Sequence, residues 1–128
     1  MGMMKRVLLV DDNNDSRRAL RLVLESQGLE CIESVNGAAA LEWLDADNAD
    51  LIVTDNQMPV LTGLEFIERL SAKPSSTLPP IIFLSGNLDE SDKARARHAG
   101  AYAILNKPCN FSEFLSVVSL ALDQSSSS

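Results

Sequence analysis

Cysteine and histidine are scarce in this chain of 128 residues. The two cysteines, Cys31 and Cys109, form no Cys-x-x-Cys pair, so the usual sequence signal of a thiol-based metal or redox site is absent. The sequence leaves a disulfide between them open, although two separate thiols of a cytosolic chain are the simpler interpretation. The one histidine, His98, has no base partner in the sequence pattern, which excludes a nucleophile triad.

The chain also lacks an excess of basic residues and any long apolar run. Its 11 Lys and Arg residues against 18 Asp and Glu residues give a net charge of −7. This charge opposes binding to nucleic acid or to anionic membranes, so neither is expected as a direct partner. No apolar run approaches the roughly 18 residues of a membrane span, and residues 1–10 lack the features of a signal peptide. We therefore expect a cytoplasmic protein.

What the sequence does contain is an alternation of short apolar runs and helix-like segments. Continuous apolar runs are typical of strands buried on both faces of a parallel sheet. The predicted strands are residues 7–10, 29–34, 51–54, 81–84 and 101–105. Helices are predicted over about 15–27 and 88–99, and further helices are predicted to begin at Asn36, Thr62 and Asn110. Such alternation predicts an α/β fold with parallel strands, right-handed crossovers and helices on both faces of the sheet.

The length suits a single domain, which we place at residues 4–122. A chain of this size buries roughly two-thirds of its unfolded surface, so its core needs neither disulfides nor a structural metal. Residues 123–128 end in four serines and are predicted to be a disordered tail or the start of a linker. In the last predicted helix, Val117, Leu120 and Ala121 widen the apolar stripe beyond what one sheet face needs, which indicates a candidate partner surface.

Polar side chains of distinct types follow four of the five predicted strands. Asp11 and Asp12 follow the first strand, Asp55 the third, Ser85 the fourth and Lys107 the fifth. The ends of parallel strands share one edge of the sheet, where open α/β folds place their chemistry, so these side chains can converge. Taken singly, each has a plainer role as a helix cap, a turn residue or a solvated surface group. Their joint occurrence at four strand ends favours one functional site.

The chemistry of this set points to phosphoryl transfer. Gathered carboxylates repel one another, so they call for a cation or a raised pKa. Oxygen ligands without histidine or cysteine favour Mg²⁺ or a similar divalent ion such as Mn²⁺. A lysine and a hydroxyl beside such a metal suit a bound phosphoryl group, because they neutralise and hydrogen-bond its oxygens. A carboxylate can itself be the nucleophile and form an acyl phosphate, and we predict that role for Asp55.

Four motifs at these positions resemble the receiver domain of two-component response regulators over nearly the whole chain. They are Val10-Asp11-Asp12, Asp55-x-x-Met58-Pro59-x-x-x-Gly63, Leu84-Ser85-Gly86 and Lys107-Pro108. The resemblance implies a flavodoxin-like (βα)5 three-layer sandwich. Its parallel sheet would have the order 2-1-3-4-5, with two helices on one face and three on the other.

The resemblance also implies partners for the domain. Asp55 would accept a phosphoryl group from a phosphohistidine on a sensor histidine kinase or a phosphotransfer protein. The domain would be a signalling module that catalyses only its own phosphorylation and dephosphorylation. Arg17, Arg18 and Arg21 are most simply a solvated helix face, and kinase partners of the family dock where the first two lie.

The ligands of the site follow from the same resemblance. Asp12 would bind Mg²⁺ directly, Asp11 would assist partly through water, and the backbone carbonyl of Gln57 would be a further ligand beside the phosphoacceptor carboxylate. Ser85 and Lys107 would contact the phosphoryl oxygens. The peptide bond between Lys107 and the following proline would be cis.

The signal would leave the site through a two-state switch. In the family, an aromatic side chain three residues before the lysine moves inward after phosphorylation. The face formed by the fourth helix, fifth strand and fifth helix is then remodelled. We expect an output domain or effector protein, and a dimer contact, on this face. Ile104 stands at the aromatic position, which departs from the family pattern.

Three alternative functions use related chemistry or folds. A haloacid-dehalogenase-type phosphohydrolase places its nucleophile after the first strand in a DxDxT motif, which residues 11–15 do not supply. A flavin-binding flavodoxin needs a first loop rich in Ser, Thr and Gly, whereas this loop is acidic and would repel a phosphate. A receiver that acts by protein contact without phosphorylation would not need the intact set of site residues.

Overall fold

In the computed structural model, the described residues 4–58, 60–73 and 78–126 form five strands and five helices in strict alternation. The elements are β1 (Arg6–Val10), α1 (Asn14–Glu25), β2 (Glu30–Ser34), α2 (Gly37–Ala46), β3 (Leu51–Asp55), α3 (Gly63–Ser71), β4 (Ile81–Ser85), α4 (Glu90–His98), β5 (Ala101–Asn106) and α5 (Phe111–Ser126). All paired strands are parallel, and their order is β2-β1-β3-β4-β5, which confirms the predicted topology.

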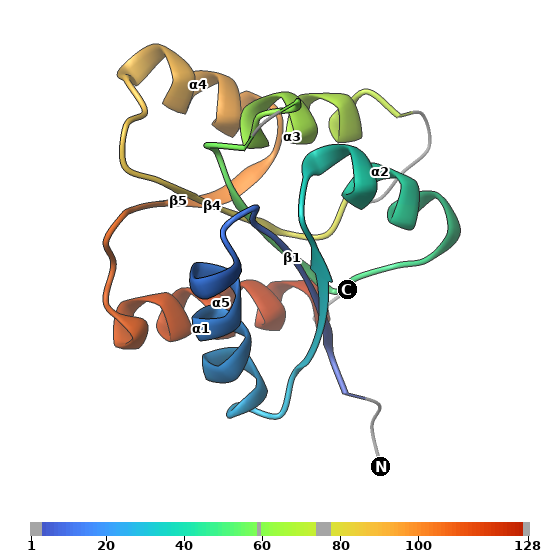
Figure 1. Ribbon diagram of the computed structural model, residues 1–128, viewed down its shortest axis with the longest axis vertical. Helices are drawn as coiled ribbons and strands as arrows, with labels where there is room; N and C mark the ends of the chain where they lie inside the picture. Colours follow the sequence, from blue (N-terminus) through green and yellow to red (C-terminus); the bar gives the residue numbers. More distant parts are fainter. Residues whose placement is uncertain (1–3, 59, 74–77, 127–128) are drawn as a thin grey trace.

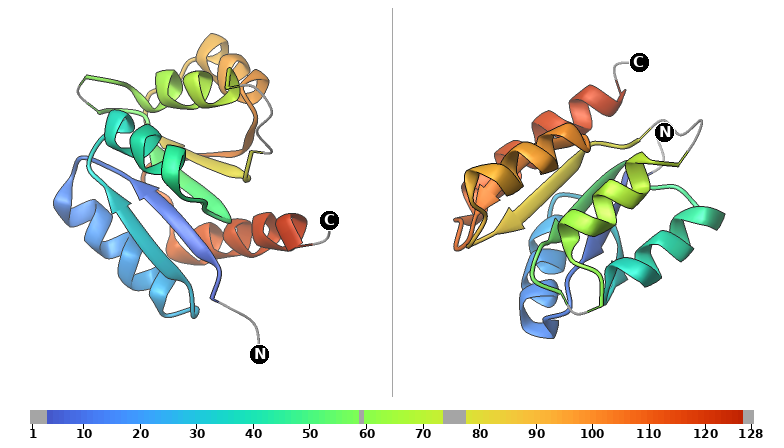
Figure 2. Two further views of the ribbon diagram at one scale, coloured as in Figure 1. Left: turned by 90° about the vertical axis from the view of Figure 1, so that its right-hand side faces the viewer. Right: turned by 90° about the horizontal axis from the view of Figure 1, so that it is seen from above.

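The sheet is the middle of three layers, with α1 and α5 on one face and α2, α3 and α4 on the other (Figures 1 and 2). Successive strand residues point to opposite faces, so each face carries its own core cluster. Val7 and Leu9 of β1 pack under α1 and α5 with Phe114. Leu8 of β1 packs on the other face with Phe66 of α3. Burial of both faces explains why the strands are continuous apolar runs.

Local sequence signals determine where the helices begin. The side chains of Asn13, Asn36 and Asp89 accept hydrogen bonds from backbone N–H groups in the first turns of α1, α2 and α4. Thr62 and Glu65 form the predicted capping box at the start of α3. These caps use backbone donors that a helix start would otherwise leave unpaired. Since each helix follows a strand in the chain, these capped first turns lie beside the carboxyl ends of the strands.

The structure departs from the expected boundaries at two helices. Helix α5 continues to Ser126, beyond the boundary predicted at residue 122, and residues 127–128 lie outside the described part. Ala121, predicted as surplus on that helix, is fully buried, whereas Leu120 is exposed. Helix α4 is shorter than predicted, because Asp89 caps it and Ala96 is its one buried residue.

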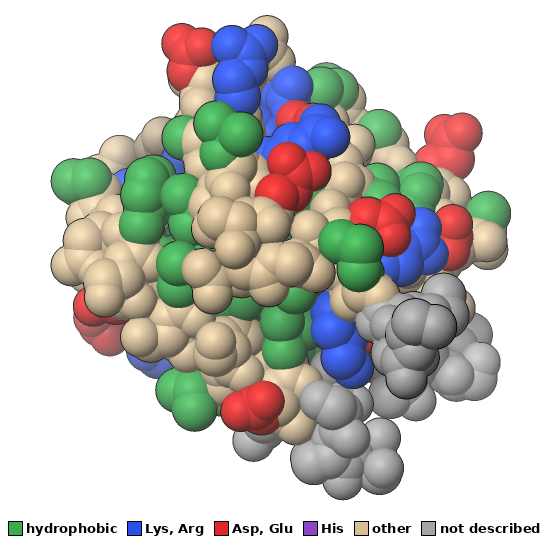
Figure 3. All heavy atoms as spheres, turned by 90° about the horizontal axis from the view of Figure 1, so that it is seen from below, with side chains coloured by type: hydrophobic (Ala, Val, Ile, Leu, Met, Phe, Trp, Pro, Cys, Tyr) green, Lys and Arg blue, Asp and Glu red, His purple; other side chains and the backbone are tan. Residues whose placement is uncertain are grey.

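The described residues bear on two questions that the sequence raised, the state of the cysteines and the presence of a membrane span. Cys31 and Cys109 are both free thiols, so the disulfide left open by the sequence is not formed. Among the described residues, no helix is long and apolar enough to cross a membrane. Seen from below, apolar side chains lie in separate patches, and basic side chains lie beside acidic ones (Figure 3).

Candidate functional site

The parallel register brings the predicted site residues to one edge of the sheet. Asp55 is the last residue of β3, the central strand, and Ser85 is the last residue of the neighbouring β4. Asp11 and Asp12 directly follow β1 on the other side of β3, and Lys107 directly follows β5. The sheet therefore gathers five residues from four separate parts of the sequence.

The three carboxylates form one acidic cluster. Asp11, Asp12 and Asp55 each offer an oxygen atom, and these atoms all lie within 4.8 Å of one another. Asp11 and Asp55 are buried, with 1% and 7% of their surface exposed, whereas Asp12 is exposed. Like charges this close and this poorly solvated repel one another strongly. The cluster is thus an unfavourable arrangement unless a cation joins it.

One buried oxygen of the cluster has no hydrogen-bond partner among the described residues. Oδ1 of Asp11 accepts a hydrogen bond of 2.9 Å from the backbone N–H of Asn13. Oδ2 of Asp11 is buried and has no partner among the described residues. An unpaired buried carboxylate oxygen is costly. This oxygen and the all-oxygen donor set fit a hard divalent cation such as Mg²⁺.

Lys107 balances part of the charge on Asp55. Its Nζ atom lies 3.3 Å from Oδ1 of Asp55, which also accepts a hydrogen bond of 2.9 Å from the backbone N–H of Asn56. The pKa of Asp55 is raised above its usual value, mainly because the carboxyl is buried. The charge of Asp11 also raises this pKa, and the ammonium of Lys107 offsets part of the increase. The bond between Lys107 and Pro108 is cis, as expected.

Ser85 lies at the end of β4, which pairs with β3 along its length. Its side chain is buried, and its Oγ accepts a hydrogen bond of 3.3 Å from the backbone N–H of Asn87. Its carbonyl oxygen accepts a hydrogen bond of 3.2 Å from the N–H of Lys107, which ties the two strand ends together. Among the described residues, no group accepts a hydrogen bond from the Ser85 hydroxyl. The hydroxyl can therefore donate a hydrogen bond to a ligand.

The loop after β3 is held close to the strand end. The carbonyl oxygen of Asn56 accepts hydrogen bonds from Met58 and Gly63, and its side-chain oxygen accepts one of 3.1 Å from Leu64. A Cβ atom at Gly63 would lie 2.1 Å from the carbonyl oxygen of Asp55, so only glycine fits. Gln57 lies in this loop with an exposed side chain. Pro59 of the motif lies outside the described residues.

One residue beside the site makes contacts that the sequence did not predict. Arg17 of α1, interpreted as part of a solvated face, has a side chain that is only 12% exposed. It donates a hydrogen bond of 2.8 Å to the backbone carbonyl of Asp11 and forms an ion pair of 2.7 Å with Glu33 of β2. The pattern of charges along one helix does not predict an ion pair with a residue of a strand, such as Glu33.

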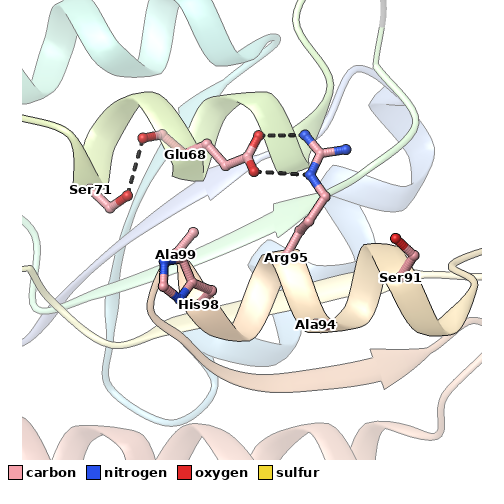
Figure 4. A pocket seen from close by; sticks show the side chains of 7 residues that line it. All are labelled: Glu68, Ser71, Ser91, Ala94, Arg95, His98 and Ala99. Carbon is pink, nitrogen blue, oxygen red and sulfur yellow. Dashed lines mark hydrogen bonds and ion pairs between the residues drawn. The ribbon is translucent and has the colours of Figure 1, made fainter.

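A hollow of about 510 Å³ lies between α3 and α4, away from the strand ends. It is crossed by a two-fold hydrogen-bonded ion pair between Arg95 and Glu68, at 2.6 and 3.0 Å (Figure 4). The described residues that line it include no cluster of carboxylates. The ion pair between Arg95 and Glu68 connects α3 to α4, a helix with little apolar surface of its own.

The fold and the site define a class of proteins: doubly wound parallel α/β domains with an acidic site at the carboxyl edge of the sheet. The model of the response regulator receiver domain family matches residues 7–119. The chain therefore belongs to this family and is a receiver domain of two-component signalling. The haloacid-dehalogenase alternative is not supported, because the match covers nearly the whole chain and is to a signalling module.

Similar proteins agree with this assignment. The chain is 30% identical over 116 residues to the polar-differentiation response regulator DivK of Brucella anthropi, covering 91% of this chain and 94% of DivK. A response regulator receiver protein of Pseudomonas putida has 30% identity and a TM-score of 0.86, over 94% of this chain and 99% of that one. The receiver domain of the sensor histidine kinase PA1611 of Pseudomonas aeruginosa has 25% identity and a TM-score of 0.83, over 94% and 99%. That domain has a magnesium ion coordinated in its active-site cleft.

The close approach at Gly63 yields a first prediction. Gly63→Ala is expected to lower the free energy of unfolding by about 2 kcal/mol or more, because the new methyl group overlaps the backbone of Asp55. Urea denaturation measures this change. Gly86→Ala is the matched control, since a Cβ there would meet Lys107 at an ordinary 3.6 Å. Equal losses in both variants would contradict the steric explanation.

The raised pKa of Asp55 yields a second prediction. A carboxyl whose pKa is higher in the folded state contributes stability at low pH that is lost as the pH rises through its folded pKa. Asp55→Asn replaces the titrating carboxyl by a neutral amide and so removes this loss of stability. Without divalent cations, its gain in unfolding free energy over the parent should therefore grow from acid to neutral pH. Asp45→Asn, at an exposed carboxylate of α2 that pairs with Lys73, is the control variant. A parent chain more stable than Asp55→Asn at neutral pH would oppose the prediction.

Proposed function

We propose that this receiver domain is a phosphorylation-dependent switch and that Asp55 accepts a phosphoryl group from a phosphohistidine on a sensor histidine kinase or phosphotransfer protein. The observation that carries the proposal is the buried Asp55 carboxylate at the end of the central strand, 3.3 Å from Lys107 and beside two further carboxylates. A nucleophile in this place meets its substrate at the sheet edge where open α/β folds bind ligands.

The metal ligands in this proposal are the carboxylates of Asp11, Asp12 and Asp55 and the backbone carbonyl of Gln57. The unpaired Oδ2 of Asp11 and the spacing of the three carboxylates support a divalent cation here. The magnesium in the cleft of the Pseudomonas aeruginosa receiver domain favours Mg²⁺, with Mn²⁺ as an alternative of similar ligand preference. When bound, the cation supplies positive charge that offsets the carboxylates and the incoming phosphoryl oxygens.

The chemistry assigned to the protein's own residues is a nucleophilic displacement. An oxygen of Asp55 attacks phosphorus, the bond from phosphorus to the histidine nitrogen breaks, and an acyl phosphate forms on Asp55. The ammonium of Lys107 neutralises charge on the phosphoryl oxygens, and the hydroxyl of Ser85 donates a hydrogen bond to one of them. Attack of water on the same phosphorus would return Asp55 to its free form. No other catalytic activity is assigned to the domain.

The output surface in this proposal is the face of α4, β5 and α5. Ile104 of β5 is half-buried against the core cluster beneath α2, α3 and α4, opposite Phe83 of β4. Since β4 ends at Ser85, a movement of that hydroxyl reaches β5 through the paired strands. An aliphatic side chain transmits this movement by packing rather than by a ring rotation. An effector, an output domain or a second copy of the domain would bind this face.

Phosphorylation itself is directly testable. With acetyl phosphate and Mg²⁺, intact-protein mass spectrometry is expected to detect one added phosphoryl group, and peptide mapping is expected to place it on Asp55. Asp55→Asn should abolish the addition. Asp45→Asn should retain it, because that exposed carboxylate lies in the last turn of α2, at the opposite end of the sheet. A phosphoryl group on any other residue would refute the assignment.

The output surface is tested with beryllofluoride, which mimics the phosphoryl group. Amide hydrogen exchange is expected to change in α4, β5 and α5 of the parent chain, and not in Asp55→Asn. Sedimentation of the same samples shows whether this face pairs with a second copy. An exchange response that omits β5 would argue against a route through Ile104.

A further inference from the structure

We infer that Arg17 is a positioning residue of the acidic site, which holds the peptide between Asp11 and Asp12 against β2 and so sets where Asp12 presents its carboxylate to a cation. This inference rests on the proposed metal site. It concerns a residue on helix α1, outside the set of strand-end residues that carry the phosphoryl chemistry.

The guanidinium of Arg17 has three partners on three segments of the chain. Nη1 donates 2.8 Å to the backbone carbonyl oxygen of Asp11, Nε donates 2.7 Å to Glu33 of β2, and Nη2 donates 2.8 Å to the side-chain oxygen of Asn14. A planar group with several fixed donors is suited to such a bridge. The side chain is 12% exposed, unlike the exposed neighbouring Arg18.

The bridge completes the attachment of Asp11 to β2. The backbone N–H of Asp11 already donates 3.1 Å to the carbonyl oxygen of Ser34, the last residue of β2. Arg17 then links the carbonyl side of Asp11 to Glu33, the residue before Ser34. Both polar groups of the Asp11 backbone are thus tied to adjacent residues of one strand.

Asp12 depends on this attachment more than the other carboxylates do. Asp55 is held by Lys107 and by a backbone N–H group, and Asp11 by Asn13. Asp12 is exposed, and among the described residues its side chain has no hydrogen-bond partner. Because the peptide unit is planar, the carbonyl that Arg17 holds fixes the plane that includes the Asp12 nitrogen. Without Arg17, the backbone next to the least restrained ligand would keep only the hydrogen bond from Asp11 to Ser34.

Arg21 distinguishes this role from that of a simple surface ion pair. It pairs with the same Glu33 and with Glu25, so it shares the charge environment of Arg17. Hydrogen bonds from Arg17, and to a smaller extent from Arg21, lower the pKa of Glu33 and keep it ionised as an anchor. Arg21 makes no contact with the Asp11 carbonyl among the hydrogen bonds of the described residues. The two arginines therefore differ in the one contact that matters here.

The test is Mg²⁺ binding measured by isothermal titration calorimetry on the unphosphorylated chain. Arg17→Ala is expected to raise the Mg²⁺ Kd about 10-fold, the range typical of residues that orient metal ligands. Arg21→Ala should stay within about twofold of the parent chain. Arg17→Lys should recover part of the affinity, because one ammonium keeps the charge but cannot span both Glu33 and the carbonyl oxygen. Amide NMR shifts of Asp12 and Asn13 should move in Arg17→Ala and not in Arg21→Ala.

The outcomes separate this inference from the function on which it rests. A parent chain that binds no Mg²⁺ overturns the metal site and the inference together. A parent that binds, with Arg17→Ala within twofold of it, overturns only the inference, and so does an equal loss in Arg21→Ala. Circular dichroism and urea denaturation check that each variant folds. If Arg17→Ala does not fold, the comparison of Arg17→Lys with Arg21→Lys decides, and equal affinities overturn the inference.

Discussion

The mutual repulsion of three carboxylates at the carboxyl edge of the sheet is the constraint on which the rest of this structure depends. Asp11, Asp12 and Asp55 lie within 4.8 Å of one another, and two of them are buried. Such an arrangement opposes folding unless neighbouring groups offset it. Lys107 supplies one positive charge at 3.3 Å, and a buried oxygen of Asp11 is left for a cation. These features support the proposed binding of a cation at this edge of the sheet.

The scaffold resists that repulsion through its two cores and its backbone ties. Every residue of β3 is buried, so the strand that ends at Asp55 is held by packing on both faces of the sheet. Gly63 and Asn56 hold the following loop against the end of that strand. Arg17 joins α1 to the other side of the cluster through Asp11 and Glu33. A rigid frame keeps the carboxylates together at the expense of stability, which is a common property of functional sites.

Much of the architecture was predictable because its signals are local or repeat along the chain. Apolar runs such as Val7–Val10 mark buried strands, and the Thr62–Glu65 pair marks a helix start. The strand-end residues were predicted as a group because parallel strands must share an edge. The end of α5 at Ser126 was not predicted, since the helix carries no apolar signal past residue 122. The contacts of Arg17 were not predicted, because its partners are Asp11, which follows β1, and Glu33 of β2.

The sequence by itself determined the element order, the parallel sheet and the identity of the residues at its edge, because these follow from periodicity, caps and spacing. Only the tertiary structure decided how those residues meet. It buries Asp55 and Asp11 while leaving Asp12 exposed, and among the described residues it offers no partner to Oδ2 of Asp11. It also turns Arg17 from a helix surface toward the Asp11 carbonyl. Burial and charge balance depend on contacts between distant segments, and no local pattern along one strand or helix contains them.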